Sequence, residues 1–116
     1  MAILSKEQIL SVDDSKTQVV EVPEWGGEVI ISTMSGFARD RFEASCIGKG
    51  GGMNMQNIRA KLVAATVVDE QGNLLFNEKD VSALGRKSCA ALERVFEAAQ
   101  RLNKISEEDV EELAKN

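Results

Sequence analysis

Histidine and tyrosine are absent from this chain of 116 residues, which also has only one proline and one tryptophan. Histidine is the commonest general base, a usual zinc ligand and the group that activates serine or cysteine nucleophiles. Its absence removes most of the side-chain chemistry of a small enzyme. We therefore expect a binding protein rather than an enzyme, with no catalytic group, metal or cofactor.

Long apolar runs and basic patches are also missing. No stretch of about 18 apolar residues could span a membrane, and the first seven residues do not resemble a secretory signal. The net charge is −5, to which residues 106–116 contribute five carboxylates and one lysine. Without a basic patch, binding of nucleic acid through its phosphates is disfavoured. Cys46 and Cys89 form no CxxC motif, and we expect two small buried thiols in a reducing cytoplasm.

Two segments share features with ligand-binding loops, but neither matches its motif. In residues 48–52 (GKGGG) a glycine follows the lysine, and the preceding element is a predicted helix, so this is no Walker loop. Residues 69–80 have the length of a calcium loop, but Leu74 stands where glycine is required and Asp80 where glutamate is required. We expect a connector and a turn.

A β-hairpin is the clearest structural signal. Residues 17–22 and 28–33 are rich in β-branched side chains, which suit strands, and they flank the run Pro23, Glu24, Trp25, Gly26 and Gly27. Proline fixes φ and glycine allows positive φ, as a hairpin loop of four or five residues requires. A lone hairpin is marginally stable in water. We expect helices to cover one of its faces, or a second copy of the chain to extend it.

The rest of the chain has helical periodicity. Helices are expected over residues 5–12, 35–47, 54–68, 78–84, 86–103 and 107–115, with a flexible glycine-rich joint at 48–52. Phe37 is expected to share the apolar face of the second helix with Phe42, and Gly85 is expected to end the fourth. The sequence therefore predicts one α+β domain over residues 1–116, mostly helical, with the N-terminal β-hairpin packed on about four or five helices.

Several passages in this order resemble the tail assembly chaperones of long-tailed bacteriophages and prophages. They cover nearly the whole chain: residues 4–10 (LSKEQIL), 20–27 (VEVPEWGG), 35–36 (SG), 39–43 (RDRFE), 62–64 (LVA), 68–73 (VDEQGN), Phe76, 83–88 (ALGRKS), 102–103 (LN) and 106–113 (SEEDVEEL). No single passage is diagnostic, because this family has no catalytic signature. The order of the passages and the hairpin sequence carry the resemblance.

The resemblance implies a helical, self-associating protein that coats the tape measure protein during tail assembly. Such a protein keeps that chain soluble, helps to recruit tail tube subunits in the host cytoplasm, and is missing from the mature virion. A shield that must later be displaced suits many weak contacts, since avidity then comes from number. The predicted contact surfaces are the hairpin tip and the apolar stripe of the last two helices: Trp25, Leu92, Val95, Phe96, Leu102, Val110 and Leu113.

Some alternatives stay open at this stage. Trp25 either folds back on the sheet or is exposed as an interface anchor. The acidic residues 107–112 are either a solvated face or a surface for a basic partner. A structural tail or head-completion protein that remains in the virion is the alternative function. The resemblance also implies a longer form made by ribosomal frameshifting, since the codons GCA-AAA-AAC would encode residues 114–116 (AKN) and contain a slippery heptamer.

Overall fold

The β-hairpin forms, as predicted. In this computed structural model, which describes residues 3–47 and 57–104, β1 (Thr17–Val22) pairs antiparallel with β2 (Gly27–Ser32). Pro23 begins the 3₁₀ turn between them, and Gly26 ends it with a left-handed φ of 73°. The fixed φ of the proline and the positive φ of the glycine are thus the two backbone features from which the loop was predicted.

A third strand, which the sequence did not predict, extends the hairpin. Helix α3 (Ile58–Thr66) ends before β3 (Val67–Val68), which pairs antiparallel with β2 in the sheet order β1-β2-β3. The expectation of helix up to Val68 is therefore wrong. Two valines at the end of a helix suit a strand equally well, and pairing with Ile30 and Ile31 decides their conformation. The expected helix start at Asn54, the glycine joint and the acidic helix 107–115 lie outside the described residues.

The other described helices are α1 (Lys6–Ser11), α2 (Gly36–Ser45), α4 (Val81–Leu84), which follows a 3₁₀ turn at Glu78–Asp80, and α5 (Cys89–Leu102). Of these, α1 and α2 begin where their polar caps predicted, whereas α4 begins three residues after the predicted residue 78 and α5 three residues after the predicted residue 86. Ser5, Ser35, Asn77 and Ser88 each accept a backbone hydrogen bond from the first turn that follows. Such bonds satisfy N–H groups that have no partner within the helix. Ser88, which lies within the helix predicted for residues 86–103, is thus the cap of α5.

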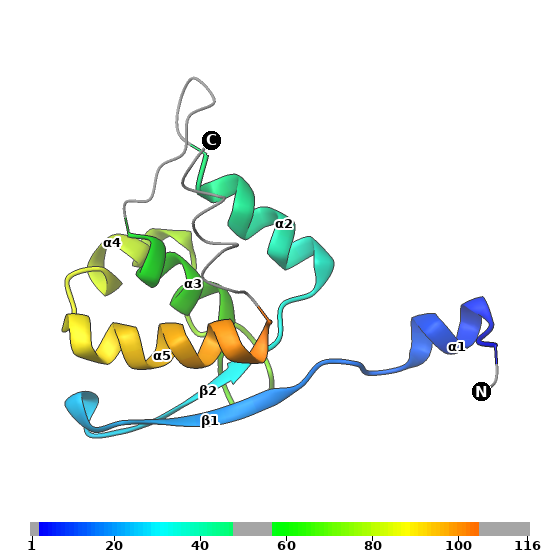
Figure 1. The fold of residues 1–116 in the computed structure, drawn as a ribbon, viewed down its shortest axis with the longest axis horizontal. Coiled ribbons are helices and arrows are strands. Elements are labelled where there is room, and N and C mark those ends of the chain that lie inside the picture. The colour runs from blue at the N-terminus through cyan, green and yellow to red at the C-terminus, as the bar shows by residue number, and fades with distance from the viewer. Residues whose placement is uncertain (1–2, 48–56, 105–116) are drawn as a thin grey trace.

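Among residues 3–47 and 57–104, helices cover one face of the sheet (Figure 1). Helix α5 lies along this inner face and packs on β1, β2 and α3, while α2 and α4 pack on α3. The fully buried side chains at the centre come from the sheet, α3 and α5: Val22, Ile31, Leu62, Val63, Val67 and Val95, with Thr66 and Cys46. The fold is α+β and mostly helical, as predicted. Helix α1 stands apart from this core, joined to β1 by an extended segment (Figure 1).

Two expectations for single residues, Phe37 and Cys89, are wrong, and a third, Gly85, holds in part. Phe37 is 73% exposed at the start of α2, where its ring lies under the guanidinium of Arg41, 5.9 Å from it. Cys89 is exposed as the first residue of α5, while Cys46 is buried and burial raises the pKa of its thiol. Gly85 follows Leu84 and ends α4 as predicted, but it does so with an ordinary φ of −64° and not in the left-handed region. A side chain there would approach Asn57 instead, because an added Cβ would lie 2.6 Å from the Asn57 Oδ1.

Asn103 fastens the end of the hairpin to the end of α5. Its Oδ1 accepts a hydrogen bond of 2.6 Å from the Met34 backbone N–H, and its Nδ2 donates one of 3.0 Å to the Ala99 carbonyl. Asn103→Ala leaves the partly buried Met34 N–H without this acceptor, so we expect the free energy of unfolding to fall by about 1–3 kcal/mol. Urea denaturation measures this, with exposed Arg101→Ala as the control; equal midpoints would contradict the prediction.

Candidate binding surfaces

The hairpin tip is held against α5 by an ion pair. The Arg94 Nε donates to Glu24 at 2.8 Å, which ties the 3₁₀ turn to the helix. Trp25, next to Glu24, is half-buried and packs against the core. The tryptophan therefore folds back on the protein while part of its ring stays accessible. Such a position gives a rigid aromatic edge, which is a usual form of interface anchor.

The ion pair at the tip makes a pH prediction. The hydrogen bond from Arg94 holds the pKa of the Glu24 carboxyl below its usual value. A lowered folded-state pKa gives stabilisation that is present above the unfolded pKa and is lost as the pH falls through the folded value. We therefore expect Glu24→Gln to be slightly less stable than the parent at pH 7, with the two converging in acid below about pH 4. Denaturation curves at several pH values measure this; a constant difference would contradict it.

Most of the predicted apolar stripe of α5 is core, not surface. Leu92, Val95 and Phe96 are 5%, 0% and 7% exposed, because α5 lays this stripe on the sheet and on α3. The periodicity that identified the stripe is equally typical of a helix face that packs within its own chain. Leu102, at the end of α5, is half-buried. Val110 and Leu113 lie outside the described residues, and contact of this set with a partner stays a prediction.

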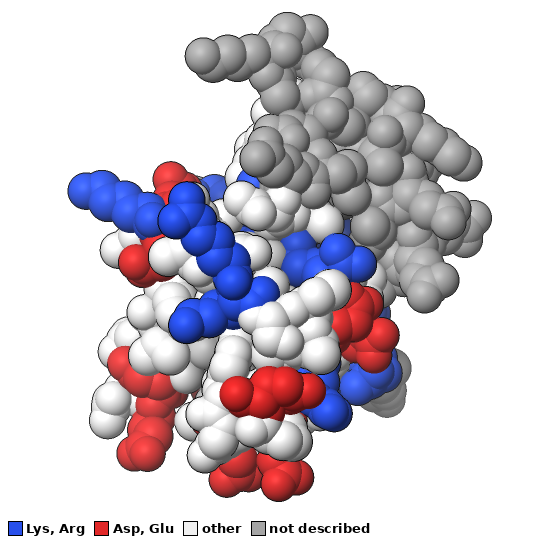
Figure 2. Space-filling view, turned by 90° about the vertical axis from the view of Figure 1, so that its left-hand side faces the viewer, with Lys and Arg blue, Asp and Glu red and all other residues white. Residues whose placement is uncertain are grey.

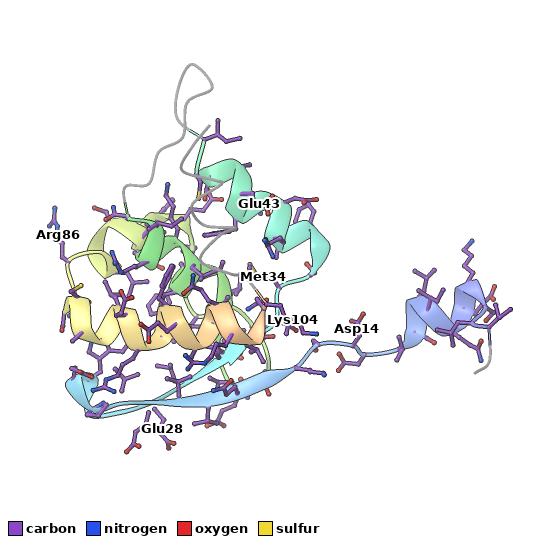
Figure 3. The ribbon with its side chains drawn as sticks, viewed as in Figure 1. Asp14, Glu28, Met34, Glu43, Arg86 and Lys104 are labelled. Atoms are coloured by element: carbon purple, nitrogen blue, oxygen red, sulfur yellow. The ribbon has the colours of Figure 1, made fainter. Side chains whose placement is uncertain are left out.

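The opposite face of the sheet carries no helix among the described elements (Figure 1). We call it the outer face, and its main side chains form two rows across the strands: Val19, Ile30, Val68 and Leu74 in an apolar row, and Glu21 and Glu28 in an acidic row. Val19 and Leu74 are each 57% exposed. Figure 3 shows Glu28 pointing away from α5. The row is thus exposed at its two ends, while Ile30 is half-buried and Val68 is only 5% exposed.

The acidic row is unusual in its pairing. Glu21 and Glu28 are direct cross-strand partners, and both are exposed. Like charges in directly opposed positions destabilise a sheet. Within residues 3–47 and 57–104 neither glutamate forms a salt bridge. Carboxylates gather at the hairpin end of the side shown in Figure 2, while most of its Lys and Arg side chains lie above them.

A shallow groove adjoins the apolar row. It has a volume of about 380 Å³ and is lined by Glu28, Ile30 and Val68 of the outer face, together with Glu70 and Leu75 from the following turn, among others. Its lining combines apolar side chains with the carboxylates of Glu28, Asp69 and Glu70. The chemistry of this groove suits an apolar side chain that is accompanied by a cation.

Helix α1 is a second apolar surface without a partner in the described structure. None of its residues is buried, and Ile9 and Leu10 are 55% and 75% exposed. Lys6 lies three and four residues before them, so the three side chains share one helix face. An isolated helix of six residues is far below the length at which helices are stable in water. The capping box of Ser5 and Gln8 stabilises its first turn, but a helix of this length also needs packing contacts to be stable.

Neither the outer face nor the apolar face of α1 was predicted from the sequence as a binding surface. Apolar side chains lie on both faces of the hairpin: Val19 and Ile30 on the outer face, and Val20 and Ile31 on the inner face. The sequence therefore did not show which face the helices would cover. Only the position of α5 distinguishes the two faces.

No helix in the described part is long and apolar enough to cross a membrane. The described residues also contain no cluster of three or more Cys, Asp or Glu able to hold a metal ion.

Comparison with known proteins gives a family. A sequence profile described as phage tail assembly chaperone matches residues 6–116. No relative is found among curated protein sequences. Among solved structures, the bacteriophage HK97 tail assembly chaperone is similar, with a TM-score of 0.61 and 18% identity, and the likeness covers 87% of this chain and 95% of that one. At this identity the structural likeness concerns the fold, while the profile concerns the family.

Proposed function

The chain belongs to the phage tail assembly chaperone family, and from this we propose that it binds the tape measure protein, keeps it soluble and helps to recruit tail tube subunits. The observation that carries the proposal is the family match over residues 6–116, which spans the described fold and the acidic residues beyond it. The family is one of chaperones and not a class of enzymes, and we propose no catalytic role.

The surfaces of the chain support reversible binding. Trp25 and Leu102 are half-buried, so each offers an accessible apolar edge on a rigid base. A half-buried side chain gives only a weak contact by itself. Many copies bound along one tape measure chain would combine such contacts through avidity. Weak single contacts also allow displacement of each copy when the tube polymerises. We propose that Trp25, Leu102 and the predicted residues Val110 and Leu113 contact the tape measure protein.

Co-expression with the tape measure protein of the same phage tests the function. We expect the tape measure protein to be soluble and to co-purify with this chain, and to be insoluble alone. Insolubility in both cases, with no complex, would overturn the proposal.

A variant at the hairpin tip tests the surface. We expect Trp25→Ser to lower the yield of soluble tape measure protein at least about threefold, since truncation of an anchoring tryptophan removes most of a contact. Phe37→Ser is the matched control, because it removes an aromatic ring that is 73% exposed on another part of the surface. Circular dichroism of both variants checks that they are folded. Equal yields with the two variants would remove Trp25 from the proposed contact.

The place of action separates a chaperone from a structural protein. We propose that the chain works in the cytoplasm of the host during assembly and leaves before the tail is complete. Mass spectrometry of purified virions should then find the tube and tape measure proteins without this chain. Stoichiometric amounts in the virion would instead favour the alternative, a tail or head-completion component.

A longer form made by frameshifting is part of the proposal. The codons GCA-AAA-AAC would encode Ala114, Lys115 and Asn116, and they contain the slippery heptamer A-AAA-AAC. The nucleotide sequence decides this: we expect a slippery run at these codons and an overlapping open reading frame in the −1 frame. A different codon choice or an early stop in that frame would rule it out.

A further inference from the structure

A cavity lined partly by cations lies where α3 and α5 begin. It has a volume of about 190 Å³, and among the residues that line it are Ile58, Arg59, Gly85, Lys87, Cys89 and Leu92. The connection between α4 and α5 comes close to α3 here, because a Cβ added at Gly85 would lie 2.6 Å from the Asn57 Oδ1. The lining thus combines aliphatic side chains with two cations, which suits a ligand that is itself aliphatic and anionic.

Arg59 is held in position on one side of this cavity. Its Nε donates to Glu93, and its guanidinium carbon lies 5.9 Å from the centroid of the Phe96 ring. A guanidinium has five N–H donors, and this hydrogen bond uses only one of them. The other four belong to the two terminal amino groups, which can form a paired contact with a carboxylate.

The connection before α5 adds two further cations, Arg86 and Lys87. Backbone hydrogen bonds of 3.2 and 3.0 Å hold both residues in the turn that follows α4. Within residues 3–47 and 57–104, neither of them forms a salt bridge. Figure 3 shows Arg86 pointing away from the body of the protein. The sequence did not reveal this cluster, because Arg59 is distant from the other two along the chain and only the fold brings them to one end of the molecule.

Residues 105–113 (ISEEDVEEL) have the complementary composition. They carry five carboxylates, and Leu113 follows directly after Glu111 and Glu112. An aliphatic side chain next to two anions matches both parts of the lining of the cavity. The phosphates of a nucleic acid would match only its cations, so the cavity favours an acidic peptide.

This segment is long enough to reach the cavity from the end of α5. The 14 residues of α5 extend for about 21 Å from Leu102 back to Cys89, which lines the cavity. Nine extended residues, from Ile105 to Leu113, reach about 30 Å. The same nine residues in a helix would cover only about 14 Å. Docking therefore requires an extended segment, and the helix predicted for residues 107–115 is the alternative, undocked state.

We propose that residues 105–113 fold back along α5 and set Leu113 in this cavity, with their carboxylates beside Arg59 and Lys87. The docked segment neutralises the cations at this end of the molecule and covers Leu113. A partner that binds Leu113 must first displace the segment, so docking regulates the contact proposed between Leu113 and the tape measure protein. This regulatory role rests on the function proposed above, whereas the docking itself is tested without the tape measure protein.

Disulfide formation within the chain tests the position of the segment. Cys89 is exposed and lines the cavity, so it serves as a natural probe, whereas Cys46 is buried. At low micromolar concentration, the full chain with Leu113→Cys should form a disulfide to Cys89 at least about tenfold faster than the full chain with Asn116→Cys. Asn116 is the matched control, because it has the longer reach but lies outside the proposed contact. Peptide mapping of non-reduced monomers measures both rates.

Two results would overturn the proposal. Equal rates for the two variants would mean that the new thiol meets Cys89 by random encounter. A disulfide that forms only between two chains would place the segment on a second copy and not on its own chain.

Charge reversal tests the cations. In the chain with Leu113→Cys, Arg86→Glu with Lys87→Glu should slow disulfide formation at least about fivefold, because repulsion replaces attraction. Lys6→Glu with Lys16→Glu is the matched control, since it changes the net charge equally at exposed residues outside the cavity. The control should react at the rate of the chain with Leu113→Cys alone, and circular dichroism checks that both variants are folded. Equal rates for the two charge variants would contradict docking on the cations.

Discussion

Val95→Asp is expected to unfold the protein. Val95 is fully buried in the middle of α5, where the helix packs on β1 and α3. An unpaired carboxylate in such a place costs several kcal/mol, even when part of the cost is met by protonation. A domain of this size is stable by about 5–15 kcal/mol, so the substitution removes a large part of the total. We expect loss of the cooperative thermal transition and a large decrease in helical circular dichroism at 37 °C.

The same substitution at Ala90 is the control. Ala90 is exposed in the first turn of α5, where a carboxylate meets the positive end of the helix dipole. Ala90→Asp should therefore have a melting temperature equal to or slightly above that of the parent chain. If Val95→Asp instead melted like the parent and lost only partner binding, Val95 would act as a surface residue, as the sequence alone had suggested.

Periodicity identified the helices and strands of this chain but not what each apolar face contacts. The stripe of Leu92, Val95 and Phe96 was recognised correctly as one face of a helix. Its assignment to a partner surface assumed that the core lay elsewhere. The apolar stripe of a helix has the same spacing whether it covers its own sheet or a second protein. Only the arrangement of α5 on the sheet separates the two cases.

Local chemistry predicted boundaries best. The serine caps of α1 and α2 and the proline and glycine of the hairpin act within three or four residues, and each was placed correctly from the sequence. Strand β3 depends instead on Ile30 and Ile31, which lie more than 30 residues away and form its pairing partners. A sequence read in short windows cannot supply such a partner, and Val67 and Val68 were therefore assigned to the preceding helix.

A pair of Leu→Ala substitutions compares a buried position in the core with an exposed position on α1. Leu62 in α3 is 1% exposed, and Leu10 in α1 is 75% exposed. The chemical change and the helix propensities are the same at both positions, so the difference between them reports packing. We expect Leu62→Ala to lower the free energy of unfolding by about 3–4 kcal/mol, which is the loss of a buried side chain together with the cavity that remains. Leu10→Ala should change it by less than about 0.5 kcal/mol.

The comparison is made by urea denaturation at low micromolar concentration, where association between copies contributes least. A large loss from Leu10→Ala at low concentration would mean that α1 packs within its own chain.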